Sequence, residues 1–182
     1  MATGILLFSM VGALPADGTG TINNPPDFRV LTSTGTQPTN GPKVAEVEAL
    51  FDAATDEHVM WAFRMPVDYA SGGTIKIPFQ NVSVQSGTLH AFWKFCLAAL
   101  TPADVVTTKV FPAPDTLDVT LANNQAAGTL TEGSAALSGT ALDGVAAGDW
   151  VILCLGRDAD HASDTATGDM AVGGIALEYV TT

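Results

Sequence analysis

Hydrophobic and polar residues alternate with a period of two along most of this chain, the pattern of half-buried β-strands. From residue 43 onward, clusters of Gly, Pro, Asn and Asp separate the hydrophobic stretches, as turns do. Eight stretches predict strands: 44–51, 58–65, 75–84, 89–100, 117–121, 128–142, 150–155 and 170–180. Helical spacing is weak everywhere, and there is no βαβ rhythm. The pattern predicts an all-β protein, an antiparallel β-sandwich of the jelly-roll type.

Several positions refine this prediction. The stretches 89–100 and 150–155 are apolar at odd and even positions alike, which predicts strands covered on both faces. The apolar parity slips after residue 79, and together with Pro78 this slip indicates a bulge and a sheet edge. Trp61, Trp93 and Trp150 are flanked by apolar residues. Core packing is favoured for all three, and the alternative is an exposed platform that stacks on sugars.

Residues 1–42 differ from the rest, because turn clusters there leave only short apolar pieces. We expect an extended N-terminal arm at 1–42 followed by a jelly-roll domain at 43–182. The apolar run at 5–11 has no preceding Lys or Arg and is too short to span a bilayer. The arm is therefore expected to contact a partner, with these candidate residues: Ile5, Leu6, Leu7, Phe8, Phe28 and Val30.

Charge narrows the choice of partners. The 182 residues carry a formal net charge of -12 and only 7 Lys and Arg, while 47% are hydrophobic. Without a basic patch the chain is not expected to bind nucleic acid or an anionic membrane surface. Cys96 and Cys154 lie in apolar strands, so they are expected to be buried thiols. A disulfide between neighbouring strands is the alternative.

Catalytic patterns are missing from the sequence, and we expect no catalytic residue, no cofactor and no bound metal. Glu46 and Glu48 share a strand face that is expected to point into solvent, so they are not a glycosidase pair. The loop from Asp158 to Asp164 holds three carboxylates that could ligate Ca²⁺, at positions 158, 160 and 164. We favour a structural loop whose side chains bond to nearby backbone, with Arg157 paired to one carboxylate.

Two segments, Phe51–Ile77 and Ala146–Tyr179, resemble small structural proteins of tailed bacteriophages and prophages. The shared features are an aromatic strand at Trp61–Pro66, a tyrosine-glycine loop at Tyr69–Gly73 and an Arg-Asp-x-Asp loop at Arg157–Asp164. The resemblance implies a non-enzymatic jelly-roll virion protein. It further implies a capsid decoration (cement) protein that forms homotrimers on the capsid surface and contacts the major capsid protein.

Two functions therefore follow from the sequence. The leading prediction is the virion structural protein, because a charge-poor, Ala/Gly/Thr-rich composition suits extensive subunit contacts. The alternative is a carbohydrate- or receptor-binding β-sandwich, on a tail fibre or in a secreted protein. An exposed aromatic row would favour the alternative, and a large apolar threefold contact would favour the first.

Overall fold

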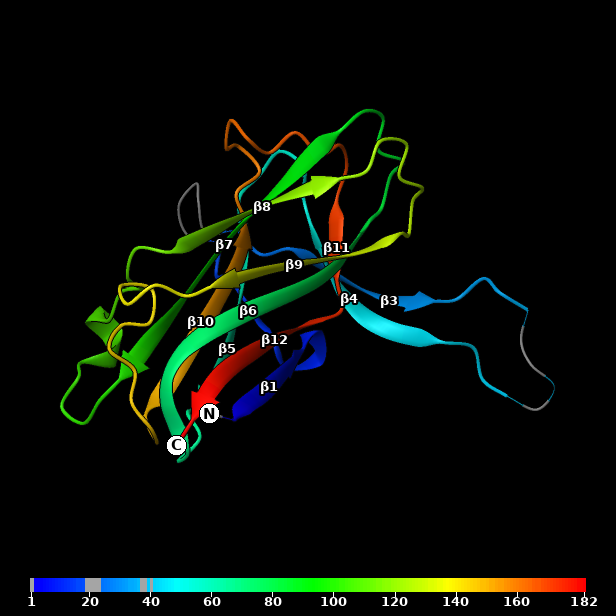
Figure 1. Cartoon of the computed structure of the whole chain (residues 1–182). Coiled ribbons are helices and arrows are strands. Elements are labelled where there is room, and N and C mark those ends of the chain that lie inside the picture. Colours follow the sequence, from blue (N-terminus) through cyan, green and yellow to red (C-terminus); the bar gives the residue numbers. More distant parts are fainter. Residues whose placement is uncertain (1, 19–23, 37–38, 40) are drawn as a thin grey trace.

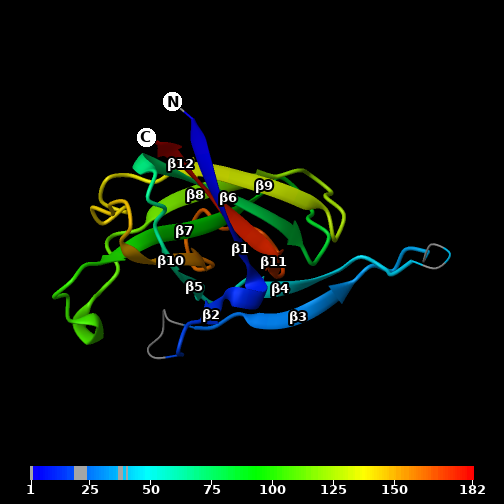
Figure 2. The same ribbon diagram turned by 90° about the horizontal axis from the view of Figure 1, so that it is seen from below.

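Two β-sheets packed face to face form the molecule, as the alternation predicts (Figure 1). This computed structural model describes residues 2–18, 24–36, 39 and 41–182. Every pair of neighbouring strands in either sheet is antiparallel. The antiparallel jelly-roll sandwich is therefore confirmed. Seen from below, the two sheets lie one above the other (Figure 2).

Seven strands belong to sheet A: β1 (Thr3–Ser9), β3 (Asp27–Thr32), β4 (Ala45–Phe51), β6 (Tyr69–Asn81), β9 (Leu130–Ala136), β11 (Met170–Val172) and β12 (Gly174–Thr181). Five belong to sheet B: β2 (Leu14–Pro15), β5 (Glu57–Arg64), β7 (Leu89–Leu100), β8 (Asp115–Leu121) and β10 (Trp150–Arg157). Two single 3-10 turns complete the structure: η1 (Met10–Gly12) and η2 (Val106–Thr108). Within the described residues, no helix is long and apolar enough to cross a membrane.

The strand order shows which strands lie at the centre and which at the edges of each sheet. Sheet A runs β1-β12-β6-β11-β4-β3, with β9 paired to the other side of β6. Sheet B runs β2-β5-β10-β7-β8, so β10 lies at its centre between β5 and β7. All eight predicted strands are present. The last one is divided at Gly173 into β11 and β12.

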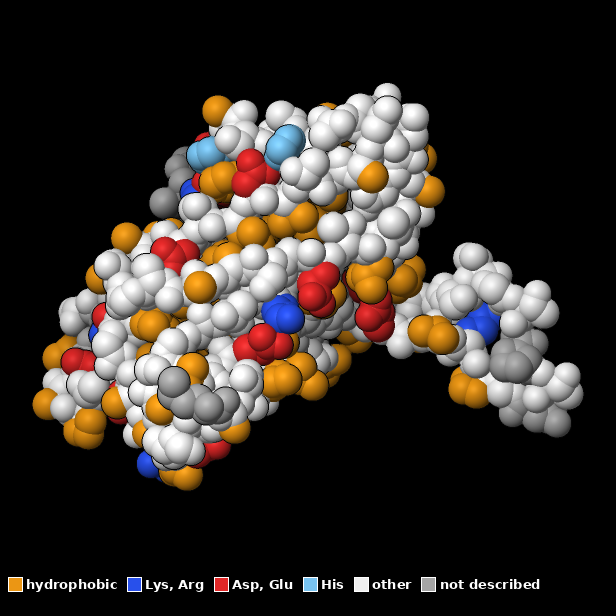
Figure 3. Space-filling view, viewed as in Figure 1, with side chains coloured by type: hydrophobic (Ala, Val, Ile, Leu, Met, Phe, Trp, Pro, Cys, Tyr) orange, Lys and Arg blue, Asp and Glu red, His pale blue; other side chains and the backbone are white. Residues whose placement is uncertain are grey.

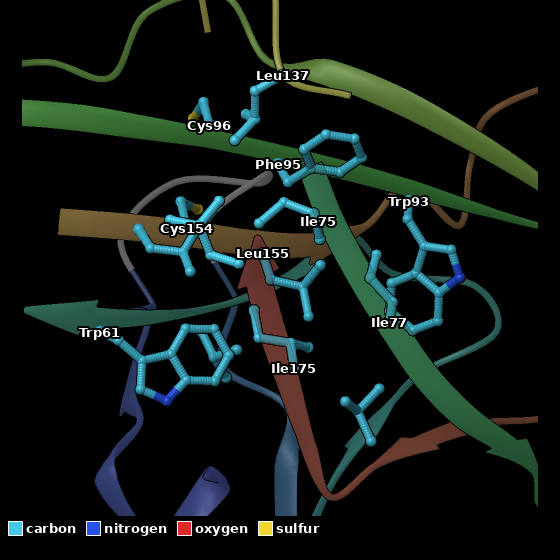
Figure 4. Close-up of a cluster of buried hydrophobic side chains, with 14 of the residues drawn as sticks. Trp61, Ile75, Ile77, Trp93, Phe95, Cys96, Leu137, Cys154, Leu155 and Ile175 are labelled. Carbon is cyan, nitrogen blue, oxygen red and sulfur yellow. The ribbon is translucent and has the colours of Figure 1, made fainter. Parts of the chain in front are cut away.

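The core lies between the sheets, where the odd-numbered residues of β5, β7 and β10 meet the inner face of sheet A. Trp61 and Trp93 are buried there, as predicted, together with Phe95 and Leu155 (Figure 4). The Trp93 ring lies 5.3 Å from the Phe51 ring and 5.2 Å from the Phe79 ring, measured between centroids. Each large buried side chain stabilises the fold by about 1.5–3 kcal/mol through loss of apolar surface to water.

The first residues form part of the sandwich. Strand β1 pairs with β12 along its whole length, from Thr3 opposite Val180 to Ser9 opposite Gly174. Phe8 packs against the core, with its ring 4.9 Å from that of Phe63. The Trp61 indole also donates a hydrogen bond of 2.9 Å to the Ser9 carbonyl. The segment expected to be a separate arm therefore contributes a strand and core side chains.

What projects from the body is a hairpin made by β3 and β4, visible in Figures 1 and 2. The strands pair from Asp27 opposite Leu50 to Thr32 opposite Ala45. The division expected between residues 42 and 43 lies in the connection of this hairpin. Figure 3 shows hydrophobic side chains on the projecting part, whereas acidic and basic side chains lie side by side over β6 and β12. Lys76 and Glu178 form one such pair, with Nζ 3.3 Å from the carboxylate.

Both ends of the described chain meet at one place. The backbone N–H of Thr181 donates to the Ala2 carbonyl at 3.1 Å, and the Thr181 hydroxyl donates to the same oxygen. Strands β1 and β12 are therefore joined up to their ends.

Two expectations in sheet A are wrong. Pro78 does not mark a sheet edge, because β6 is flanked there by β9, with Pro78 opposite Glu132. On the other flank the pairing passes from Lys76 to Gln80 across the break between β12 and β11, so the N–H that proline lacks is not needed. Glu48 does not point into solvent either.

Glu48 on β4 is fully buried. Its carboxylate accepts a hydrogen bond of 2.9 Å from Arg29 Nε and another from the Gln80 amide. The alternation placed Glu48 on an outer face, but the side chains of Arg29 on β3 and Gln80 on β6 contact it there. A buried carboxylate of this kind requires a paired cation.

Arg157 at the end of β10 is fully buried and carries a complete set of partners. Its Nε and Nη2 atoms bond to the two carboxylate oxygens of Asp164 at 3.0 and 2.9 Å. The remaining N–H groups donate to three carbonyl oxygens, those of Phe51, Ala166 and Gly168. The predicted pairing of Arg157 with a carboxylate is thereby confirmed. This bidentate pair ties β10 to β4 and to the loop before β11.

Replacing Arg157 with Met should destabilise the protein by about 3–5 kcal/mol, because Asp164 would be left buried without a cation. Chemical denaturation followed by tryptophan fluorescence would measure the loss. The control is Lys76→Met, which breaks the half-exposed pair with Glu178 and should cost less than about 1 kcal/mol. Equal losses in the two variants would contradict this assignment.

Glu57 gives the stability a pH dependence. Burial raises the pKa of Glu57 to about 7, and the Asp52 and Asp169 carboxylates act in the same direction, although the Asp52 N–H bond opposes it. The folded state thus holds this proton more tightly than the unfolded state. Its stabilising contribution is present below about pH 4.5 and is lost as the pH rises toward 7.

We expect the free energy of unfolding of wild type to fall by about 1 kcal/mol over this window, a value reduced for solvent screening at a half-buried side chain. In Glu57→Gln the fall should be smaller, because Glu46 and Asp158, whose pKa values are also raised, remain in place. Denaturant titrations at several pH values would test this, and a variant with the same slope as wild type would refute it.

Candidate functional site

The outer face of sheet B carries four rows of side chains that run across β5, β10 and β7. The strand register sets their membership: Arg64-Trp150-Leu100, Ala62-Ile152-Ala98, Met60-Cys154-Cys96 and His58-Gly156-Lys94. We call the surface formed by these rows the outer B face. Residues directly opposite in neighbouring strands point to the same side of a sheet, so each row is a line of adjacent side chains.

A cavity of about 470 Å³ lies over the third and fourth rows. Its floor is sulfur-rich, and the connection from β7 to β8 supplies a wall through Phe111, Pro112 and Pro114. At the centre of the fourth row the His58 imidazole lies over Gly156, which has no side chain and leaves room for it, because a Cβ there would collide with the ring. Volumes of about 300–1,000 Å³ are typical of small-molecule and cofactor sites.

Trp150 lies at the opposite end of the outer B face, with 59% of its surface exposed. The expectation that all three tryptophans pack in the core is therefore wrong for this one. Trp150 opens strand β10 directly after a turn, and its cross-strand neighbours are Arg64 and Leu100. The Arg64 Nε donates to the Gly148 carbonyl at 2.8 Å. This bond holds the guanidinium close to the start of β10, where Trp150 lies.

An ion network closes the other end of the outer B face. Lys94 Nζ lies 2.7 Å from the Asp158 carboxylate and 3.4 Å from that of Asp56. Burial alone lowers the pKa of Lys94, but the two carboxylates outweigh it and raise that pKa. Asp160 completes a group of three carboxylates whose oxygens lie within 4.8 Å of one another. Lys94 supplies the positive charge that this group requires.

The environment of His58 favours the neutral form of its imidazole. Burial lowers its pKa, and although the Asp56 carboxylate acts in the opposite direction, Lys94 adds to the lowering. The imidazole therefore offers one N–H donor and one acceptor beside the cavity.

The structure separates the residues expected to bind a partner. Ile5 and Leu7 are exposed on β1, whereas Leu6 and Phe8 point inward and pack against the core. Phe28 and Val30 are exposed on β3, in the projecting hairpin. The alternation along β1 thus divides the candidates between a surface and the core. Binding of a partner at these positions stays a prediction.

The three carboxylates that could ligate one Ca²⁺ according to the sequence, those of Asp158, Asp160 and Asp164, do not meet at one point in the structure. Asp164 points to Arg157 and also accepts the Phe92 N–H at 3.0 Å. Asp158 and Asp160 instead lie beside Asp56, from the loop before β5. Spacing along one loop could not reveal this partner, because Asp56 is about one hundred positions away in the sequence.

Sequence reasoning missed Trp150, Arg64 and Lys94 as surface groups. Lys94 is a charged residue inside the apolar strand 89–100, and that exception was the available signal. For Trp150 the signal was its place next to a Gly-Asp turn, since strand ends are covered less completely than strand centres.

Comparisons with known proteins find similar structures but no sequence family. No protein-family model matches the chain, and no curated protein matches it. A carbohydrate-binding module described as CBM28 and specific for non-crystalline cellulose has a TM-score of 0.49 and 13% identity, over 90% of this chain and 86% of its own. The CBM22-1 xylan-binding domain of Paenibacillus barcinonensis Xyn10C has a TM-score of 0.47 and 12% identity, over 100% and 97%.

A third solved structure, the CBM35 module of Cellvibrio japonicus Abf62, has a TM-score of 0.46 and 12% identity, over 98% of this chain and 99% of its own. The leading prediction of a phage capsid decoration protein is wrong by this comparison, since these structures are carbohydrate-binding modules. The motifs behind that prediction have structural roles here, since Trp61 lies in the core and Arg157 in the buried ion pair.

Because the Lys94 ammonium already lies between Asp56 and Asp158, where a cation would have to bind, we expect added CaCl₂ to leave the melting temperature of wild type unchanged. In Lys94→Met the same carboxylates would lack a cation, and calcium should then raise the melting temperature. Differential scanning fluorimetry of both proteins, with MgCl₂ and NaCl at matched ionic strength, would measure this. A calcium-dependent rise in wild type would contradict the role given to Lys94.

Proposed function

We propose that this protein is a non-catalytic carbohydrate-binding β-sandwich that binds a neutral glycan chain along the outer B face. The observation that carries this proposal is the exposed indole of Trp150, held on the same face as the cavity. Ordinarily a Trp side chain is largely buried, because its apolar area is large. An indole left exposed at the centre strand of a sheet is suited to stack on the apolar face of a sugar ring.

Polar groups that suit sugar hydroxyls lie at both ends of this surface. Beside Trp150, the Arg64 guanidinium has N–H groups in addition to the Nε bonded to Gly148. At the far end, Lys94, Asp56 and His58 border the cavity and offer both donors and acceptors. A ligand that makes apolar contacts on one face and hydrogen bonds at its edges matches this arrangement.

The dimensions favour a chain of sugars over a single ring. Trp150 and Gly156 are six residues apart on β10, which corresponds to about 20 Å at about 3.3 Å per residue. In the second row Ala62 is exposed and Ile152 is half-buried, whereas Ala98 is covered, so a chain between the indole and the cavity would lie over β5 and β10. The net charge of -12 would repel polyanionic glycans, so a neutral polysaccharide is the better match.

The same surface gives no support for hydrolysis. A glycosidase needs two carboxyl groups on opposite sides of the scissile bond, one of them free to donate a proton. The carboxylates that border the outer B face are Asp56, Asp158 and Asp160 at one end, and Lys94 bonds to the first two. This clustering suits binding rather than acid-base catalysis.

Substituting Trp150 with Ala should weaken polysaccharide binding about thirtyfold, which corresponds to about 2 kcal/mol for a central aromatic contact. Affinity gel electrophoresis against soluble xylan, hydroxyethylcellulose and other neutral polysaccharides would identify the ligand, and calorimetry would give the affinities. The first two are included because solved structures of similar fold bind xylan or cellulose. The fold should persist, since the side chain is exposed.

The matched control is Leu130→Ala, which removes another exposed apolar side chain, on β9 of sheet A. This variant should bind like wild type. Retardation that is equal in wild type and Trp150→Ala would refute the location of the site. A wild-type protein that binds no neutral glycan on an array would refute the function.

A further inference from the structure

Three sulfur-containing side chains lie side by side in the third row of the outer B face. Cys154 on β10 is directly opposite Met60 on β5 and directly opposite Cys96 on β7. All three line the cavity. Side chains opposite each other in antiparallel strands have Cβ atoms about 4.5–5.5 Å apart. Three sulfur atoms can therefore converge on one point above the centre strand.

The two cysteines are free thiols that lie directly opposite each other on β7 and β10. They are 3% and 8% exposed, although both border the cavity, so a small ion can reach them while bulk water is largely excluded. Figure 4 shows Cys96 and Cys154 on neighbouring strands. Any small hydrophobic residues could occupy the two positions that hold Cys96 and Cys154. Together with Met60 in the same row, these cysteines give the cavity a floor of soft donor atoms.

We propose that Met60, Cys96 and Cys154 form a binding site for a thiophilic monovalent metal ion of the Cu(I) class. Thiolate and thioether ligands select soft ions. Calcium and magnesium prefer oxygen ligands, and structural zinc takes four nitrogen or sulfur ligands, whereas this row presents three sulfurs. Binding replaces two thiol protons with one Cu⁺, so two protons leave for each ion bound and no electron is transferred.

The charge of the filled site is small. Two thiolates and one monovalent ion carry a net charge of -1, and Lys94, which is already paired with Asp56 and Asp158, lies two residues from Cys96 on the same face of β7. The apolar ring of Phe111 and the two prolines above the cavity would limit access of larger oxidants. The site lies at the floor of the cavity that belongs to the proposed glycan surface, but it uses no residue of the Trp150 row, so loss of copper uptake and loss of glycan binding can be told apart with separate variants.

The test is transfer of Cu(I) from its bicinchoninate complex to the full chain, kept reduced and free of oxygen. The loss of chelator colour should show one ion bound per chain, accompanied by ultraviolet thiolate-to-copper absorption. Cys96→Ser and Cys154→Ser should each lower the affinity at least a hundredfold. Met60→Leu, which nearly conserves volume, should lower it about tenfold.

Met65→Leu is the matched control, because Met65 is a buried methionine outside the row. It should bind Cu(I) like wild type, and so should Trp150→Ala. X-ray absorption should find three sulfur ligands in wild type and two in Met60→Leu, a readout that does not depend on the stability of the cysteine variants.

Several results would overturn the proposal. One is a wild-type chain that takes no Cu(I) from the chelator while both thiols remain titratable. Another is uptake that Met60→Leu and Met65→Leu reduce equally. A third is a pair that already forms a disulfide under the reducing conditions of the assay, because a disulfide leaves no thiolate to bind the ion.

Discussion

The buried pair of Arg157 and Asp164 is the interaction on which the arrangement of this sandwich depends. One guanidinium at the end of β10 reaches the last residue of β4 and three positions of the loop that leads to β11. Asp164 in turn accepts a backbone N–H from β7. A charge this deep is tolerated only when all its hydrogen-bonding groups are satisfied. The pair therefore fixes how the end of sheet B meets sheet A.

The candidate glycan surface follows from this anchoring. Since β10 is held at its end and paired along both sides, its register against β5 and β7 is fixed, and so are the four rows of the outer B face. A binding surface made by the strands themselves is more rigid than one made by loops. The ligand would meet an indole, a narrow apolar strip and a charged cavity in a set order.

Period-two alternation was enough to predict the fold, because the core strands bury one face and the pattern records which residues are on it. It could not predict which outer faces are covered. Trp150 and Glu48 show the two kinds of error: the first was expected inside and is exposed, and the second was expected outside and is buried against Arg29 and Gln80. The partners of Glu48 lie on other strands, which the alternation along β4 alone does not show.

The first 42 residues show a related limit. Strands β1 and β3 are edge elements that gain stability only from β12 and β4, so their own short apolar runs carry little local signal. The resemblance to phage proteins rests on residues of another kind. Its motifs contain Trp61 and Arg157, which build the interior, and residues that build a sandwich can be shared by proteins with unrelated surfaces.

The hydrogen bonds between Ala2 and Thr181 have a consequence for engineering. Because the first and last strands are neighbours, a short linker could join them and new ends could be opened in a surface connection. For the same reason the whole sandwich could be inserted into an exposed loop of a host protein, entering and leaving at one point. The outer B face belongs to the opposite sheet, so it would stay open to solvent in such a fusion.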